Sequence, residues 1–158
     1  MTLYFINKKW LRILTFLLTL WILGILIAPL MVISGNKILI SISDYLYFFY
    51  KPTCHQDPQR SFPIAGHHIC VCVRCFAIYL AGLALTVYYY SKKTIKIWTS
   101  VRYTLLILPA LCDFMLEKVA IYQNIKFVRF GTGIILGIAL FHLLIIGTST
   151  CAKPQHRN

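Results

Sequence analysis

The chain has 158 residues, of which 59% are hydrophobic and 13% are charged, and its formal net charge is +12. A soluble domain usually carries about a quarter charged residues, so this composition favours an integral membrane protein. The basic residues flank apolar runs, which argues against nucleic acid as a partner and for contact with the anionic headgroups of a lipid bilayer. We expect a single all-α transmembrane domain over residues 1–158.

Four apolar runs are long enough to cross the hydrocarbon core, which needs about 20 residues. These predicted transmembrane helices cover about residues 11–33, 71–90, 97–117 and 127–148. Between the first two lies "ILISISDYLYFFY", residues 38–50, which is shorter and more polar and is predicted to be an interfacial helix. It is followed by a polar Cys/His-rich loop, residues 51–75, which holds four of the six cysteines.

Lysine and arginine counts predict the orientation, because cytoplasmic flanks carry an excess of these residues. With four spans, both termini and the loop at residues 91–96 share one side of the cell membrane. That side has eight basic residues: Lys8, Lys9, Arg12, Lys92, Lys93, Lys96, Lys153 and Arg157. The other side has six: Lys37, Lys51, Arg60, Lys118, Lys126 and Arg129. We therefore expect cytoplasmic termini and an external cysteine-rich loop.

The loop and the start of the second span hold residues that bind metals. Cys72 and Cys75 form a Cys-x-x-Cys pair, and a Cys-His pair lies about 17 residues upstream, as in a zinc site. The predicted zinc ligands are Cys54, His55, Cys72 and Cys75. Adjacent residues in regular structure point apart, so the Cys-His pair reaches one ion only if the backbone turns sharply. Otherwise His67 or His68 completes the ligand set.

Two other interpretations of these cysteines remain open. Cys72 and Cys75 could cycle as a redox-active disulfide, because Arg74 between them would favour the thiolate. In plan, this is similar to the quinone-linked disulfide oxidases, which are also four-helix membrane proteins. Alternatively, a disulfide such as Cys54–Cys72 staples the loop, and the protein is a scaffold or a transporter of a small anionic ligand.

Polar residues are expected to gather beside the cysteines, because the loop, the end of the third span and the start of the fourth share one side. A carboxylate within a span is costly and marks a functional site by default. We expect Asp113 to pair with Arg129 or Arg74 and to orient a pocket suited to an anionic small molecule or a lipid headgroup. The predicted pocket residues are Gln56, Arg60, Ser61, Arg74, Tyr79, Asp113, Asn124 and Arg129.

Two features of the fourth span predict helix contacts. His142 lies in the middle of an apolar run, where a hydrogen bond to a neighbouring helix is expected. Gly133 and Gly137 form a Gly-x-x-x-Gly motif, which permits close helix approach. The approach could occur within the bundle or between copies in a homo-oligomer.

The motifs resemble those of a family of small bacterial and archaeal membrane proteins, domain-of-unknown-function family 2085, over about residues 50–137. "CHQDPQRSF" and "VCVRCFAIYLAG" carry its Cys-His-Gln, Pro, Arg-Ser, Cys-x-Arg-Cys and Ile-Tyr-x-Gly elements. The looser later part of the pattern implies functional positions at Asp113, Asn124, Arg129, Thr132 and Gly133. Ala77 and Phe114 stand where the family usually has glycine. The resemblance implies a membrane fold and no particular reaction.

Overall fold

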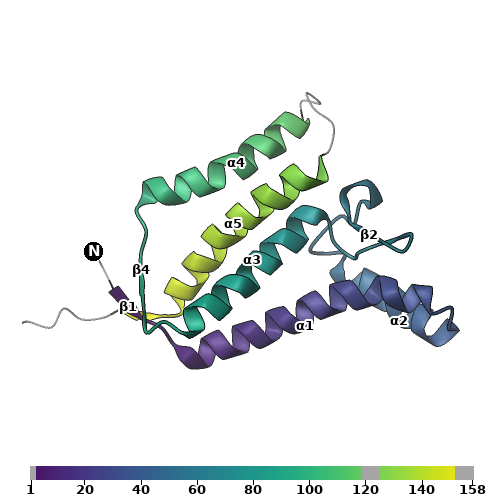
Figure 1. Ribbon diagram of the computed structural model, residues 1–158, viewed down its shortest axis with the longest axis horizontal. Helices are drawn as coiled ribbons and strands as arrows, with labels where there is room; N and C mark the ends of the chain where they lie inside the picture. The colour runs from purple at the N-terminus through teal and green to yellow at the C-terminus, as the bar shows by residue number, and fades with distance from the viewer. Residues whose placement is uncertain (1–2, 119–124, 152–158) are drawn as a thin grey trace, which may run out of the picture.

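The computed structural model of the protein describes residues 3–118 and 125–151, and Figure 1 shows its elements. The helices within these residues are α1 (Lys8–Ile33), α2 (Lys37–Tyr50), α3 (Val73–Tyr90), α4 (Ser100–Lys118) and α5 (Lys126–Gly147). The short elements are β1 (Leu3–Phe5), the 3-10 turn η1 (Pro58–Arg60), β2 (Pro63–Ile64), β3 (His67–His68), β4 (Thr94–Lys96) and β5 (Thr150–Cys151). The predicted all-α class is confirmed.

Three of these helices, α1, α3 and α5, are long and apolar enough to cross a membrane. They correspond to the predicted spans at residues 11–33, 71–90 and 127–148. The remaining predicted span, at residues 97–117, corresponds to α4, which is not among the three. Its 19 residues include the charged residues Arg102, Asp113, Glu117 and Lys118, which make it less apolar than the others.

Capping residues and strand pairing set the helix starts. The side chain of Asn7 accepts hydrogen bonds from backbone N–H groups in the first turn of α1, so this helix begins before its apolar run. Asn36 caps α2 in the same way, through the N–H of Ile38. The start of α4 lies at Ser100, three residues later than predicted, because the preceding β4 pairs with β1.

A small antiparallel sheet in the order β4-β1-β5 closes one end of the bundle (Figure 1). It joins the chain before α1, the connection between α3 and α4, and the chain after α5. Lys8 strengthens this end, because its ammonium group donates to the carbonyl groups of Tyr89 and Tyr90 at the carboxyl end of α3. We call this end of the bundle the strand end. The segments that meet there are those predicted to lie on the same side of the membrane: the chain before α1, the connection between α3 and α4, and the chain after α5.

The helices α1 and α2 form an antiparallel hairpin, and α2 packs along the second half of α1 (Figure 1). Two buried hydrogen bonds fix it. Ser43 Oγ donates to the carbonyl of Ala28 at 2.9 Å, and the hydroxyl of Tyr50 donates to the carbonyl of Trp21 at 2.8 Å. The same contact builds a core of apolar residues that also contains Cys54, Cys70 and Val71. The hairpin therefore supports the loop that carries the first cysteine.

The helices α3 and α5 are in close contact, and glycines make this possible. A Cβ atom on Gly133 would lie 2.7 Å from the carbonyl oxygen of Arg74. One on Gly137 would lie 2.7 Å from the carbonyl oxygen of Ile78 and 2.9 Å from Cβ of Ala81. The Gly-x-x-x-Gly motif is therefore used within the bundle, between α5 and α3.

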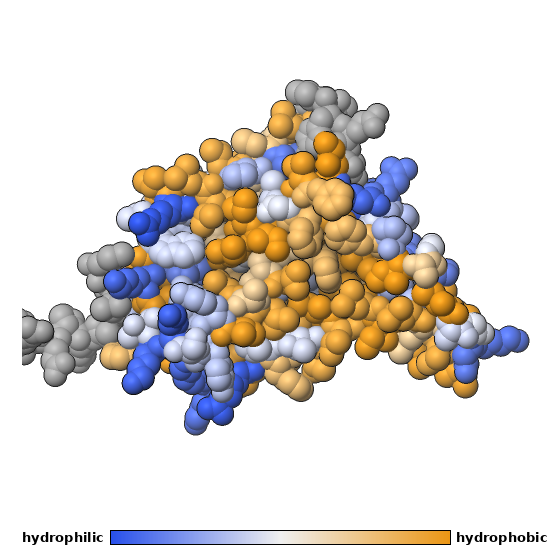
Figure 2. All heavy atoms as spheres, viewed as in Figure 1, coloured by the Kyte–Doolittle hydropathy of each residue, from blue (hydrophilic) through white to orange (hydrophobic). Residues whose placement is uncertain are grey.

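The outer surface of the bundle is largely apolar. Figure 2 shows a hydrophobic band over the middle of the visible face, with hydrophilic side chains gathered toward the two ends of the helices. Val101, Leu105 and Leu108 on α4 and Phe16 on α1 are among the exposed apolar side chains. An exposed apolar surface of this extent is typical of a protein that lies in lipid.

The contact between α3 and α5 predicts a stability difference between two alanine substitutions in the same helix. Gly137→Ala places a Cβ against the backbone of α3, and overpacking should lower the free energy of unfolding by about 1–2 kcal/mol after the gain in helix propensity. Gly131→Ala is the matched control, because nothing lies within 4 Å of the added Cβ. Thermal unfolding in detergent, followed by tryptophan fluorescence, should show a lower Tm for Gly137→Ala only. Equal melting temperatures would contradict the packing argument.

Candidate metal centre

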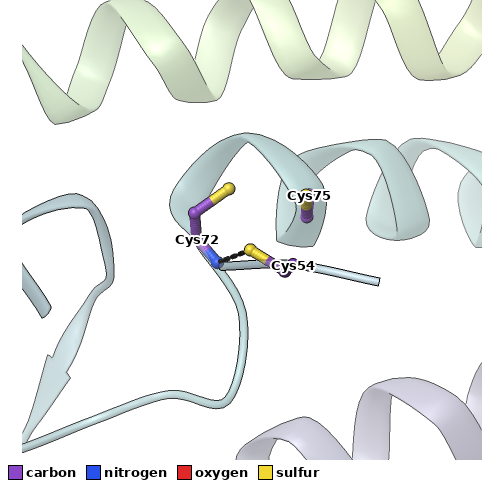
Figure 3. A group of neighbouring side chains, drawn as sticks. All are labelled: Cys54, Cys72 and Cys75. Atoms are coloured by element: carbon purple, nitrogen blue, oxygen red, sulfur yellow. Dashed lines mark hydrogen bonds between the residues drawn. The ribbon is translucent and has the colours of Figure 1, made fainter. Parts of the chain in front are cut away.

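Three cysteines that are distant in sequence meet at the amino-terminal end of α3 (Figure 3). The Sγ atoms of Cys54, Cys72 and Cys75 all lie within 4.8 Å of one another. Cys54 comes from the loop after α2, Cys72 is the N-cap of α3, and Cys75 lies in the first turn of that helix. The Cys-x-x-Cys spacing is three residues, which places both thiols on the same side of the first turn. We call these three residues the cysteine cluster.

A turn at Gln56 brings Cys54 into the cluster. Gln56 has φ +55°, a left-handed conformation that is uncommon for a residue other than glycine. Its side-chain amide donates to the carbonyl of Tyr47 at 2.6 Å, which ties the turn to the end of α2. The backbone therefore turns sharply next to the Cys-His pair, but the turn does not bring His55 into the group of three sulfurs.

Hydrogen bonds make Cys54 the acceptor of the cluster. The thiols of Cys72 and Cys75 donate to Cys54, and this lowers the pKa of Cys54 well below its usual range. The backbone N–H groups of Gln56 and Cys72 add to the effect, the second at 3.1 Å from Sγ. The same interaction with Cys54 raises the pKa of Cys72. These hydrogen bonds favour negative charge on Cys54 at a helix amino terminus, where the helix dipole acts in the same direction.

The three histidines of the loop lie outside the cluster. The group of mutually close ligand atoms contains no histidine among the described residues, so the structure does not place His55, His67 or His68 with the three sulfurs. His55 is exposed and lines the same cavity as Cys54, but its ring nitrogens are not in this group. His67 and His68 form β3, which pairs with β2. The predicted four-ligand set is therefore assembled in part.

Cys54, Cys70, Cys72, Cys75 and Cys112 are free thiols. The disulfide considered for Cys54 and Cys72 is therefore not formed in the structure. Cys70 lies next to the cluster in sequence but is fully buried, and burial raises the pKa of its thiol to about 12. We conclude that Cys70 serves as an apolar core residue.

The cysteine cluster opens onto a cavity of about 630 Å³. Its lining consists of Thr53, Cys54, His55, Gln56, Asp57, Arg60, Cys72, Arg74, Cys75, Phe114 and Arg129. These residues come from the loop, α3, α4 and α5, which explains why no single sequence motif contains them all. Thr53 and Phe114 were not predicted from the sequence. Neither carries a pattern that distinguishes a cavity residue from an ordinary loop or helix residue.

An ion pair lies beside the cavity: Arg74 lines the cavity, whereas its partner Asp113 is not a lining residue. Asp113, which is 4% exposed, forms its ion pair with Arg74, and Thr132 Oγ1 donates to the same carboxylate at 3.3 Å. Of the two partners expected for this carboxylate, the structure thus selects Arg74. Arg129 is 3% exposed and also lines the cavity. A second ion pair, between Arg60 and Asp57 at 2.9 Å, lies at the solvent-exposed rim.

The other predicted pocket residues have different places. Ser61 is fully buried but does not line the cavity, and its hydroxyl donates to the carbonyl of Asp57 at 2.9 Å. Tyr79 packs against the core beside the cluster, with its ring centroid 5.8 Å from that of Trp21. Asn124 lies outside the described residues. Ser61 and Tyr79 therefore support the loop and the first turns of α3 rather than forming the cavity wall.

His142 belongs to a separate polar contact within the helix bundle. Its Nδ1 lies 2.9 Å from the hydroxyl of Tyr103 on α4, and its ring stacks on Trp98 with a centroid separation of 3.8 Å. The predicted hydrogen bond to a neighbouring helix is confirmed. This contact fixes α4 against α5 and contributes no ligand to the cysteine cluster.

The ion pair predicts the effect of neutralising Asp113. Asp113→Asn keeps the shape of the side chain but leaves the cation of Arg74 without its counter-charge, which should lower the free energy of unfolding by about 2–3 kcal/mol. Adding Arg74→Gln to this variant should recover most of the loss, because the unbalanced charge is then removed. Denaturation of detergent-solubilised protein measures both values. If Asp113→Asn is as stable as the parent, the prediction is wrong and the ion pair between Asp113 and Arg74 is exposed to water.

Comparison with known proteins agrees with this arrangement. Residues 54–143 match a family described as "Predicted membrane protein (DUF2085)". The chain is 33% identical over 145 residues to an uncharacterized protein of Methanocaldococcus jannaschii, covering 88% of this chain and 93% of the relative. It is 31% identical over 99 residues to an uncharacterized protein of Methanothermobacter thermautotrophicus, covering 58% of this chain and 83% of the relative. No solved structure matches the chain. The protein therefore belongs to the DUF2085 family of predicted membrane proteins.

Proposed function

We propose that the chain is a membrane metalloprotein in which Cys54, Cys72 and Cys75 bind one zinc ion at a membrane face. The observation that carries this proposal is the mutual approach of the three Sγ atoms within 4.8 Å. Zinc–sulfur bonds of about 2.3 Å in a tetrahedral site separate the sulfurs by about 3.8 Å, so small rotations of these side chains suffice. Binding would displace the two thiol protons that now point at Cys54.

Three protein ligands leave one tetrahedral position, and we propose that it faces the cavity. Structural zinc sites are usually closed by four protein ligands, whereas catalytic sites keep a position for water or substrate. His55 lines the same cavity and is the residue of this chain best placed to occupy the position in the absence of another ligand. A zinc ion with an open position would polarise a group bound there.

The arginines of the cavity support an anionic ligand, either a small molecule or a lipid headgroup. Arg60, Arg74 and Arg129 line the wall, where Arg60 forms an ion pair with Asp57 and Arg74 forms one with Asp113. A zinc ion with three thiolates has a net charge of −1, so part of this positive charge would offset the metal centre itself. Guanidinium groups bind carboxylate and phosphate through paired hydrogen bonds, which would orient such a ligand toward the open zinc position.

A thiol–disulfide function is the second candidate, and one observation favours it. Cys54 accepts hydrogen bonds from both thiols of the Cys-x-x-Cys pair, which lowers its pKa, and both thiols lie beside it as potential disulfide partners. Zinc and disulfide exchange make opposite demands on the same sulfurs. Metal binding keeps all three reduced, whereas exchange requires a bond between two of them.

Metal content separates the two candidates. Protein purified in detergent without chelators should contain about one zinc per chain by elemental mass spectrometry, and Cys72→Ser should lose it because one of three ligands is removed. Cys112→Ser is the matched control, because Cys112 is an exposed thiol on α4 outside the cluster. His55→Ala should retain most of the zinc if the fourth position is open.

Two results would overturn the zinc proposal. A metal-free protein that loses two titratable thiols under mild oxidant would support the redox candidate instead. A metal-free protein whose thiols all stay reduced under the same treatment would exclude both candidates.

We also propose that α4 is a fourth transmembrane helix and that both termini are cytoplasmic. At about 1.5 Å per residue, its 19 residues extend about 28 Å, close to the thickness of the hydrocarbon core. Val101, Leu105 and Leu108 form an exposed apolar stripe at helical spacing. The excess of eight basic residues over six supports cytoplasmic termini in the cell membrane.

Fusions to alkaline phosphatase, which is active only outside the cytoplasm, test this topology in a bacterial host. Fusions after Gly35 and between α4 and α5 should be active, and fusions after Lys93 and at the carboxyl terminus should be inactive. Four alternating results require that α4 crosses the membrane. Equal activity on the two sides of α4 would contradict the fourth span, and the inverse pattern would contradict the orientation.

A further inference from the structure

A groove of about 520 Å³ lies between α1 and α3 near the strand end. It is at the opposite end of α3 from the cysteine cluster. Phe16 on α1 and Val87 on α3 line it and are 63% and 56% exposed. Both helices are long and apolar enough to cross a membrane, so this groove faces the lipid. A membrane-facing groove of this size is filled by part of a lipid molecule, because water is excluded from the hydrocarbon core.

The floor of the groove is apolar in spite of its two threonines. Thr15 Oγ1 donates to the carbonyl of Leu11 at 2.8 Å, and Thr19 Oγ1 donates to the carbonyl of Thr15 at 2.8 Å. These bonds to the preceding helical turn satisfy both hydroxyls, so the threonines need no polar ligand. The groove can therefore accommodate a hydrocarbon chain along its length.

The rim of the groove is basic. Arg12 and Ser91 line it at the end nearer the strands, and Arg12 is exposed. The distance from Arg12 to Thr19 along the helix is about 10 Å, enough for the upper part of an acyl chain. A cation at one end of an apolar groove is the arrangement that fits an anionic amphiphile.

The strand end has no carboxylate of its own to balance this charge. The chain has four acidic residues, Asp44, Asp57, Asp113 and Glu117, and they belong to α2, the loop and the carboxyl-terminal part of α4. Basic residues at the strand end include Lys8, Lys9, Arg12, Lys92, Lys93, Lys96 and Arg102. Lys8 is already engaged by the carbonyl groups at the end of α3. No aspartate or glutamate of the chain is therefore available to neutralise the other basic residues at the strand end.

We propose that this groove is a binding site for one anionic phospholipid. The phosphate lies at Arg12, and an acyl chain runs between α1 and α3 toward Thr19. Free phosphate offers the same charge to Arg12, but it leaves the apolar part of the groove unfilled. The site is independent of the zinc proposal, because none of its lining residues belongs to the cysteine cluster or its cavity.

Native mass spectrometry of the full chain in detergent, titrated with phosphatidylglycerol, tests the site. Arg12→Gln should bind the first phosphatidylglycerol about fivefold more weakly, which corresponds to about 1 kcal/mol for one basic residue at the membrane surface. Arg102→Gln is the matched control, because it removes one exposed charge from the same end but lies outside the groove. Phosphatidylcholine should show no difference between the variants.

A second variant separates the groove from simple surface charge. Val87→Trp fills the groove and leaves every charge in place, so it should weaken phosphatidylglycerol binding as well. Inorganic phosphate should not compete with the lipid. The proposal is overturned if Arg12→Gln and Arg102→Gln lose affinity equally, if Val87→Trp binds as the parent does, or if inorganic phosphate displaces the lipid.

Discussion

The close approach of α3 and α5 is the contact on which the cysteine-rich end depends. Gly133 leaves just enough room for the carbonyl group of Arg74, and that residue lies between the two cysteines of the Cys-x-Arg-Cys motif. The glycine contact therefore sets the position of the first turn of α3, with its two thiols and its guanidinium group. Because the same turn of α5 carries Arg129 and Thr132, one helix contact places the cavity wall and the ion pair together.

Cys54, the third cysteine of the cluster, is held near the first turn of α3 by different contacts. Cys54 follows α2, which is held against α1 by hydrogen bonds from Ser43 and Tyr50. The chain then turns at Gln56, which has a positive φ angle. The side-chain amide of Gln56 donates a hydrogen bond to the carbonyl of Tyr47. The Cys-His-Gln motif thus has a structural explanation for its first and third residues. His55 is exposed and lies at the wall of the cavity.

Local sequence patterns predicted what depends on local physics. Apolar runs located α1, α3 and α5, and the Cys-x-x-Cys spacing placed Cys72 and Cys75 together, because each follows from helix periodicity and burial. The late start of α4 was missed because it depends on the pairing of β4 with β1, which is remote in sequence. The distance of His55 from the sulfurs and the choice of Arg74 over Arg129 as partner of Asp113 also depend on tertiary geometry, which no spacing encodes.

The unequal lengths of α1 and α3 have a mechanical consequence. The first has 26 residues and the second 18, a difference of about 12 Å at 1.5 Å per residue. Helices of such different length fit one bilayer by tilting relative to each other, and in Figure 1 the axes of α1 and α3 diverge from the strand end rather than run parallel. Cys54 is attached to the long helix through α2, whereas Cys72 and Cys75 belong to the short one. The relative position of these two helices therefore determines how closely Cys54 lies to the other two sulfurs.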